Sequence, residues 1–160
     1  MNELRVGVGL DAHAFTDDAA LVLGGVDFPD ERGLAGHSDG DVVAHALIDA
    51  ILGAAGLGDI GGLFPSSDPQ WLDASSIRLL QRAYEVVRGA RWALVNADCV
   101  LIGEQPRIAP VREAMQARLA GAMGVELDRV AVRATSTDGL GFAGRGEGLA
   151  AQAVALLGRG

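Results

Sequence analysis

The feature that most constrains the fold is an apolar stretch over residues 41–55 that carries polar side chains at a spacing of four. On a helix, Asp41, His45 and Asp49 would form one polar stripe. The residues between them are mostly apolar, which predicts that the opposite side of this helix faces the core. An imidazole buried in such a core costs free energy unless it is paired. The stretch therefore predicts a polar partner for His45 elsewhere in the chain.

Asp11 and His13 are the proposed partners, at the end of a predicted strand over residues 4–10. Side chains two positions apart on a strand point the same way, roughly 6–7 Å apart. With His45 they offer one carboxylate and two imidazoles and leave a fourth ligand position open, which is typical of catalytic zinc. The alternative is that His45 is a hydrogen-bonded core histidine and that Asp11 ends a turn. All three histidines of the chain, which include His37, lie within residues 11–13 and 37–49, and this favours the metal site.

Length and charge narrow the class of protein. A chain of 160 residues with 49% hydrophobic residues predicts a single domain over residues 1–160. The net charge of −8 argues against a nucleic-acid partner, although metal ions could offset it for an anionic substrate. The single cysteine, Cys99, excludes an intrachain disulfide. Neither a signal segment nor a membrane-length apolar run is present, so we expect no membrane association and a cytoplasmic location.

Predicted strands and helices interleave along the chain. This order predicts an α/β (α+β) fold, with a mixed sheet whose helices pack on one face. Ser38 and Asp41 have capping-box spacing, which predicts that the first helix starts there. The predicted strands are residues 4–10, a hairpin of 21–23 with 26–28, 92–102 and 130–136. The predicted helices are 41–55, 74–88, 109–123 opened by Pro110, and an Ala-rich segment 148–157.

Three loops carry further candidate binding residues. The long loop at 56–73 is rich in Gly, Pro, Ser and Asp, and its residues 58–68 could lie over the metal site. Residues 103–109 run from a strand to a helix start, where backbone N–H groups can hold an anion or a base edge. Residues 135–148 offer hydroxyls, exposed backbone donors and Arg145, which together predict a phosphate cradle. Each loop alone could equally be simple turn geometry, and Arg145 could form a surface ion pair.

These motifs, in this order, resemble the 2-C-methyl-D-erythritol 2,4-cyclodiphosphate synthase family of the non-mevalonate isoprenoid pathway. The resemblance covers nearly the whole chain. The matching segments are G-x-G-x-D-x-H-x-F at 7–15, H-S-D-G-D-x-x-x-H-A at 37–46, L-G-D-I-G at 57–61, F-P at 64–65, Q-P-R at 105–107 and G-R-G-E-G at 144–148.

The resemblance implies a lyase. The enzyme would convert 4-diphosphocytidyl-2-C-methyl-D-erythritol 2-phosphate to 2-C-methyl-D-erythritol 2,4-cyclodiphosphate and release CMP. It also implies a homotrimer with active sites between subunits, one zinc or other divalent cation per subunit, and a second cation, magnesium or manganese, that enters with the substrate. An isoprenoid diphosphate in the trimer centre is a further implied partner.

The resemblance assigns roles to individual residues. Asp11, His13 and His45 match the zinc ligands, and Asp138 matches a ligand of the second metal. His37 and Ser136 match catalytic positions. The substrate-binding positions are Asp11, His13, His37, Ser38, Asp49, Asp59, Ile60, Gly61, Phe64, Pro65, Ser66, Ser67, Asp68, Thr135, Ser136, Thr137, Asp138, Phe142 and Arg145, with 64–68 as a flexible flap. The nucleotide-binding positions are Gly103, Glu104, Gln105, Pro106, Arg107, Ile108 and Ala109.

Three positions depart from the family pattern. Ser66 stands where a carboxylate is frequent, which removes a flap contact. Asp138 stands where the family often has the longer glutamate, so it would reach a metal only through water. Gly139 replaces a residue that is commonly basic.

Two other functions remain open from the sequence. The same ions could activate water, which would make the protein a hydrolase of nucleotide diphosphate esters. The assembly could instead be a binding module that stores metal or holds an isoprenoid diphosphate in a threefold channel lined by Leu10, Phe142, Arg145 and Glu147. Apolar residues in such a channel could equally be trimer packing.

Overall fold

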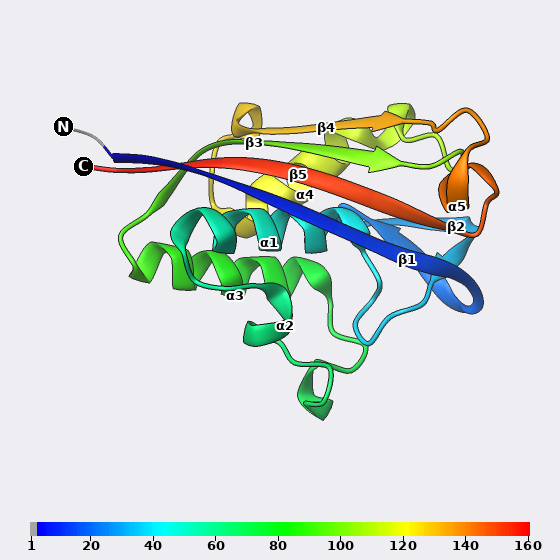
Figure 1. Ribbon diagram of the computed structural model, residues 1–160, viewed down its shortest axis with the longest axis horizontal. Helices are drawn as coiled ribbons and strands as arrows, with labels where there is room; N and C mark the ends of the chain where they lie inside the picture. The colour runs from blue at the N-terminus through cyan, green and yellow to red at the C-terminus, as the bar shows by residue number, and fades with distance from the viewer. Residues whose placement is uncertain (1–2) are drawn as a thin grey trace.

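A twisted five-stranded sheet forms one layer of the computed structural model, which describes residues 3–160 (Figure 1). Its strand order is β2-β1-β5-β3-β4. β3 and β4 are parallel, and the other neighbouring pairs are antiparallel. The described ends of the chain lie side by side because Glu3 pairs with Arg159. The strands are β1 (Glu3–Leu23), β2 (Val26–Leu34), β3 (Ala93–Ile102), β4 (Val130–Thr135) and β5 (Gly148–Arg159).

The three long helices form the second layer, on one face of the sheet (Figure 1). α1 (Val42–Ala55) packs against β1 and β5, α3 (Ser76–Gly89) packs against α1, and α4 (Arg112–Met123) packs against α3. The expected mixed sheet with helices on one face is confirmed, and the fold is a single-domain α+β fold. Within residues 3–160, no helix is long and apolar enough to cross a membrane.

Twelve of the 14 residues of α1 are buried, so this helix is the centre of the core. Of the three residues in the predicted polar stripe, Asp41 lies outside the helix. Asp41 is the N-cap, and its carboxylate accepts hydrogen bonds from the backbone N–H groups of Ala44, Gly24 and Gly25. The predicted capping box is therefore wrong in detail: Asp41 caps the helix, and Ser38 faces His45 instead.

The predicted helix over residues 148–157 is wrong. These residues form β5, which lies in the middle of the sheet between β1 and β3. Alanine favours helices in isolation, but here alternate alanines face the helical layer, and the pairing of β5 with its neighbouring strands overrides that preference. Ala151, Ala153 and Ala155 are buried, whereas Gln152 and Val154 are exposed.

The other predicted elements differ from the structure mainly at their ends. The strand predicted over 4–10 continues to Leu23, where it turns into the predicted hairpin with β2. The helix predicted over 109–123 begins as a 3-10 turn, Ala109–Val111, in which Pro110 occupies a first-turn position where its missing N–H costs no hydrogen bond. The long loop contains a short helix, α2 (Ile60–Leu63), and a 3-10 turn, Pro69–Trp71.

Candidate metal centre and active site

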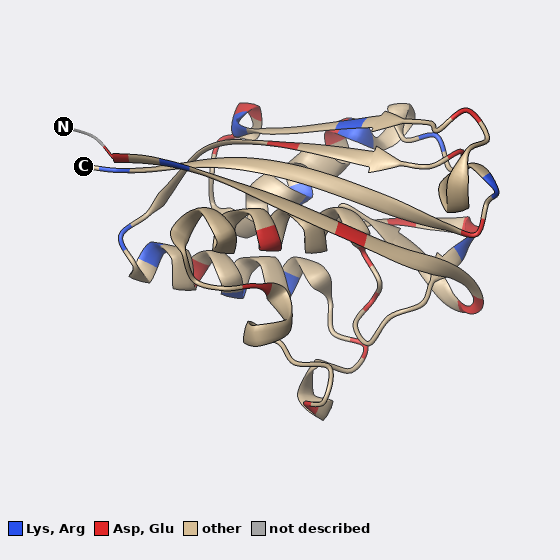
Figure 2. Ribbon diagram, in the orientation of Figure 1, with Lys and Arg blue, Asp and Glu red and all other residues tan. Residues whose placement is uncertain are grey.

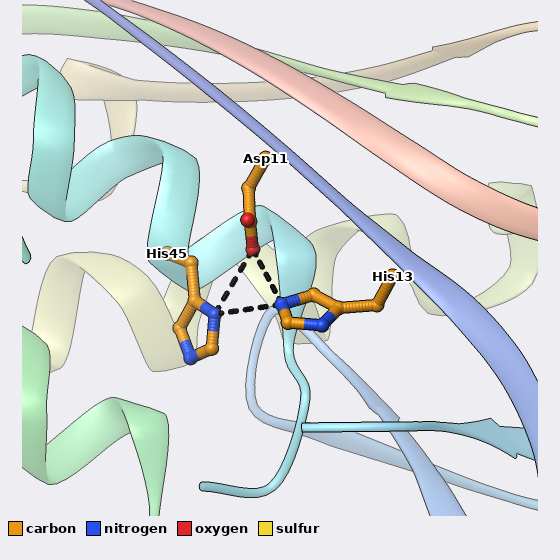
Figure 3. A group of neighbouring side chains, drawn as sticks. All are labelled: Asp11, His13 and His45. Carbon is orange, nitrogen blue, oxygen red and sulfur yellow. Dashed lines mark hydrogen bonds and ion pairs between the residues drawn. The ribbon is translucent and has the colours of Figure 1, made fainter. Parts of the chain in front are cut away.

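Asp11, His13 and His45 converge on one point between β1 and α1 (Figure 3). Asp11 Oδ2 lies 2.9 Å from His13 Nε2 and 3.0 Å from His45 Nδ1. The two imidazole nitrogens are 3.3 Å apart. The three residues predicted to be metal ligands therefore lie close together, and each presents one ligand atom to the same space.

The spacing of these atoms fits a tetrahedral cation. Ligands about 2.0–2.1 Å from a zinc ion lie roughly 3.3 Å from one another along the edges of the tetrahedron. The three observed separations, 2.9, 3.0 and 3.3 Å, are close to that edge. Two imidazole nitrogens that face each other at 3.3 Å cannot both carry a proton, so a cation between their lone pairs explains the arrangement. The residues present thus fit a divalent cation.

The charges of the triad also favour cation binding. Burial alone would raise the pKa of Asp11, but its contacts with the His13 and His45 imidazoles lower it to about 2. The Asp11 carboxylate in turn raises the pKa of His13, and a hydrogen bond to the Ala35 backbone adds to this effect. Asp11 therefore stays ionised near neutral pH, which supplies the negative charge that a divalent cation requires.

The position of the triad follows from the alternation of β1. Gly7, Gly9, Asp11 and His13 all point to the helical layer, since they are two residues apart on one strand. The glycines allow the backbone of α1 to lie directly on the strand. This close approach brings His45, on the first turns of α1, within hydrogen-bond distance of Asp11.

A cavity of about 260 Å³ opens directly beside the triad. His37 and Ser38 line it, and His37 Nε2 lies 3.1 Å from the backbone oxygen of Asp68, at the base of the predicted flap. Phe64 and Trp71 pack edge to face in the wall, with ring centroids 4.9 Å apart. The predicted substrate residues that line this cavity are Asp11, His13, His37, Ser38, Ile60, Gly61, Phe64 and Ser66, and the predicted metal ligand His45 lines it too.

Asp49 and Asp59 do not line this cavity, but they hold α2, whose residues Ile60 and Gly61 do. Asp49 accepts a hydrogen bond of 2.7 Å from the Ile60 N–H, and Asp59 caps α2 through the Gly62 N–H. Burial raises the pKa of Asp49, and the Ile60 N–H opposes this effect. The remaining flap residues, Pro65, Ser67 and Asp68, do not line the cavity, although Asp68 caps the following 3-10 turn.

The other predicted binding loops lie outside the lining of this cavity. Residues 103–109 and 135–139 lie next to each other, because Glu104 Oε1 accepts a hydrogen bond of 3.2 Å from the Thr137 N–H. Ser136 Oγ lies 3.2 Å from Asp138 Oδ1, and Asp138 has a positive φ of 53°. One chain therefore does not bring these predicted nucleotide and second-metal residues into the cavity beside the triad.

Phe142 and Arg145 lie on α5 (Gly141–Gly144) and just after it. Phe142 and Glu147 line a second cavity of about 260 Å³ with Ala12, His13 and Ala14. Arg145 Nε donates to Glu147 Oε1 at 2.9 Å, so within the chain its charge is paired. An isoprenoid diphosphate at this position stays a prediction.

Two residues that the sequence analysis did not predict lie behind the triad: Ser76 contacts His45, and Asp39 contacts Ser76. Ser76 is the first residue of α3, and its Oγ lies 2.8 Å from His45 Nε2. Asp39 accepts hydrogen bonds from both the N–H and the hydroxyl of Ser76. Asp39 could have been predicted as a site residue because it lies in the H-S-D-G-D motif at 37–41, whereas no motif around Ser76 indicates a role for that residue.

The fold and the site define a class: a single-domain α+β protein with a carboxylate–bis-imidazole centre for a divalent cation beside a cavity. The YgbB family model matches residues 4–158, so the chain belongs to the YgbB family. A curated relative from Rubrobacter xylanophilus, named 2-C-methyl-D-erythritol 2,4-cyclodiphosphate synthase, is 58% identical over 99% of this chain and 98% of its own length.

Solved structures show the same fold. The bifunctional IspDF of Campylobacter jejuni matches with a TM-score of 0.96 and 42% identity, over 100% of this chain and 43% of that longer one. A 2C-methyl-D-erythritol-2,4-cyclodiphosphate synthase in a CDP-bound form matches with a TM-score of 0.86 and 37% identity, over 96% of this chain and 99% of its own. The resemblance seen in the sequence motifs is confirmed.

Proposed function

We propose that this protein cyclises 4-diphosphocytidyl-2-C-methyl-D-erythritol 2-phosphate to 2-C-methyl-D-erythritol 2,4-cyclodiphosphate and releases CMP. The observation that carries the proposal is the convergence of Asp11, His13 and His45 beside a cavity that His37 and Ser38 also line. The names of full-length relatives support the same activity. Residues 1–160 act as one catalytic domain in this proposal.

The reaction needs positioning and charge neutralisation more than a base. An oxygen of the 2-phosphate, already ionised near neutral pH, attacks the β-phosphorus of the diphosphate. A new P–O bond forms there, the bond from the β-phosphorus to the bridging oxygen breaks, and CMP leaves with that electron pair. The obstacle is bringing an anion onto a phosphorus surrounded by negative oxygens, so the protein must hold both groups in line and balance their charge.

The residues around the cavity divide this work. Asp11, His13 and His45 hold a divalent cation, which supplies positive charge to the phosphate oxygens when it is bound. We take this cation to be zinc because one carboxylate and two imidazoles with an open position are a typical zinc set. His37 and Ser38, which line the same cavity, supply hydrogen-bond donors and orient the 2-phosphate. Asp49, with Asp59, Ile60 and Gly61, holds the hydroxyls of the sugar alcohol.

The flap and the remaining loops hold the rest of the substrate. Residues 64–68 cover the cavity. The loop of residues 103–109 takes the cytidine, and the CDP-bound relative supports a cytidine nucleotide as the ligand. Thr135, Ser136, Thr137, Phe142 and Arg145 surround the diphosphate, where Ser136 is the second catalytic residue. Asp138 holds a second divalent cation, magnesium or manganese, together with the substrate.

Because the nucleotide loops lie outside the cavity within one chain, we propose that a neighbouring subunit supplies them in a homotrimer. The outer face of the sheet supports association. It carries exposed apolar side chains on β1 and β5, and β5 has no charged residue before Arg159 (Figure 2). Exposed apolar patches of this kind mark contact surfaces between proteins. The exposed side chains on this face include Leu4, Val6, Val8, Leu10 and Val154. The cytoplasmic location expected from the sequence stays a prediction.

Product analysis tests the proposal. The purified protein, loaded with zinc and supplied with magnesium, is incubated with the substrate in ¹⁸O-labelled water, and the products are followed by ³¹P NMR and mass spectrometry. A cyclic diphosphate and unlabelled CMP are expected. An open-chain product that contains ¹⁸O would identify a hydrolase instead, and no turnover by zinc-loaded protein would overturn the proposal. His45→Ala, checked for folding by circular dichroism, is expected to be inactive.

A further inference from the structure

The ring of His45 is held on both of its nitrogens. Nδ1 points into the triad, 3.0 Å from Asp11 Oδ2. Nε2 points away from the triad, 2.8 Å from the hydroxyl of Ser76. Ser76 is fully buried at the start of α3, and among residues 3–160 Asp41, His45 and Ser76 are the buried polar residues. A serine at this place therefore needs a reason beyond solubility.

Asp39 fixes the direction of the hydrogen bonds behind His45. Its carboxylate accepts one bond from the Ser76 N–H at 2.9 Å and a second from the Ser76 hydroxyl. An ionised carboxylate can only accept, so the hydroxyl hydrogen of Ser76 points to Asp39. The Oγ lone pairs of Ser76 are then left to accept the N–H of His45 Nε2.

This direction matters because a histidine binds metal through a nitrogen that carries no proton. If Nδ1 of His45 faces a cation, the ring proton must lie on Nε2, and that N–H needs an acceptor in the core. Ser76 is an acceptor there only while Asp39 takes its hydroxyl hydrogen. The chain Asp39–Ser76–His45 thus favours the one tautomer that can bind metal through Nδ1.

Ser38 is a second contact of Nε2, at 3.0 Å. It differs from Ser76 because it is only half-buried and lines the cavity beside the triad. The hydroxyl oxygens of Ser38 and Ser76 are 3.5 Å apart. The hydroxyl that donates to Asp39 is that of Ser76. Of the two contacts of His45 Nε2, the contact with Ser76 is therefore the one whose direction is set by a further protein group, the Asp39 carboxylate.

We propose that Ser76 and Asp39 are positioning residues for the metal centre, which set the tautomer and orientation of His45 and so raise the affinity of the triad for a divalent cation. This inference rests on the metal centre of the proposed function, but not on the reaction. The arrangement joins three separate segments, the loop before α1, α1 itself and the start of α3, so the metal centre depends on how α3 packs against α1.

Zinc affinity measured without substrate tests the inference. The zinc dissociation constants of the wild type, Ser76→Ala and Asp39→Asn are measured by competition with a chromophoric chelator. Loss of a group that orients a metal-bound histidine typically weakens binding about 10- to 100-fold, and we expect this for both variants. In Asp39→Asn, an amide N–H₂ replaces one of the two oxygens that Ser76 uses, while size and shape are nearly unchanged. This variant keeps the test valid if Ser76→Ala folds poorly.

NMR of the zinc-loaded protein provides a readout that a merely structural role would not move. In ¹⁵N-histidine-labelled wild type, the Nε2 proton of His45 is expected as a downfield, slowly exchanging signal, and Ser76→Ala is expected to lose it. Ser75→Ala is the matched control, because Ser75 is an exposed neighbour whose side chain makes no capping hydrogen bond. We expect it to match the wild type in both measurements.

The outcomes separate this inference from the proposed function. Wild-type zinc affinity and an unchanged His45 signal in both folded variants would overturn the role of Ser76 and Asp39, while the proposed reaction would stand. A wild type that binds no zinc would overturn the metal centre, and the inference with it. Tight zinc binding without formation of cyclic product would overturn the proposed reaction only.

Discussion

Gly9 of β1 lies directly against the carbonyl oxygen of Ala46 in α1, so closely that a Cβ on Gly9 would overlap that oxygen and the Ala50 N–H. Gly7 stands in the same relation to Ala50 and Ala54. Two glycines on one face of β1 thus pack against alanines that lie one turn apart on α1. This contact sets the distance between strand and helix at which Asp11 and His45 meet.

Gly9→Ala is therefore expected to damage both stability and metal binding. The added methyl group has no free space, and α1 must move away from β1 to admit it. Overfilling a packed core costs about 1–3 kcal/mol, and the shift of α1 separates His45 from Asp11. Urea unfolding and zinc titration should show lower stability and weaker zinc binding.

The matched control for this variant is Gly121→Ala. Gly121 is an exposed residue inside α4, and a Cβ there would meet nothing within 4 Å. Because alanine is the better helix former, this change should stabilise the protein by up to about 1 kcal/mol and leave zinc binding unchanged. Equal stability losses in the two variants would contradict the packing argument.

The buried carboxyl group of Asp41 predicts a pH dependence of stability. Burial raises its pKa to about 6, although the N–H groups of Ala44, Gly25 and Gly24 act in the opposite direction. Since the pKa in the folded state lies above the unfolded value, the contribution of this group is complete below pH about 4 and is lost as the pH rises through 6.

Asp41→Asn, which does not titrate, isolates this contribution. The free energies of unfolding of wild type and variant are compared at pH 5.0 and at pH 7.5. The advantage of the wild type over the variant should fall by about 1 kcal/mol between these values. An advantage that instead grows with pH would mean that the three N–H donors outweigh burial and hold the carboxylate charged.

His37 should act on the substrate and not on the metal. It lines the cavity beside the triad, but it is absent from the group of atoms that converge on the cation position. His37→Ala is expected to lower kcat about 100-fold or more, because a hydrogen-bond donor near the reacting phosphate is lost. Its zinc content should equal that of the wild type. A variant that loses zinc and activity together would place His37 in the metal centre instead.

The metal ligands could be predicted from the sequence because their geometry is local. Asp11 and His13 share one face of a strand wherever that strand lies, and His45 stands on a helix too apolar to hold an imidazole without a partner. Ser76 could not be predicted in this way. It reaches His45 only because α3 packs across α1, and no pattern within either segment contains that contact.

The misassigned strand β5 has a similar cause. Its run of alanines is compatible with a helix by propensity, and the decisive information is its place between β1 and β3, which the pairing of distant segments sets. The alternation from Ala151 to Leu157 was the available signal. In the same way, the sequence around Gly7 and Gly9 does not show why glycine is needed there. The structure does: α1 packs so closely against these two residues that a side chain would not fit.

The apolar outer face of the sheet gives the last prediction. Val8 lies on this face and is 60% exposed within one chain. If the face is buried between subunits, a charged side chain there must be desolvated without a partner, and the assembly should dissociate. Val8→Arg is expected to run as a monomer in light scattering and sedimentation, whereas the wild type is expected to run as the proposed trimer.

The activity of Val8→Arg should fall with its assembly, because the nucleotide loops would no longer reach the cavity of a neighbour. Zinc binding should persist, since Asp11, His13 and His45 all come from one chain. Val86→Arg is the control: Val86 is an exposed valine on α3, in the helical layer and away from the outer face of the sheet. It should remain trimeric and active. A wild type that is monomeric and fully active would contradict the shared active site.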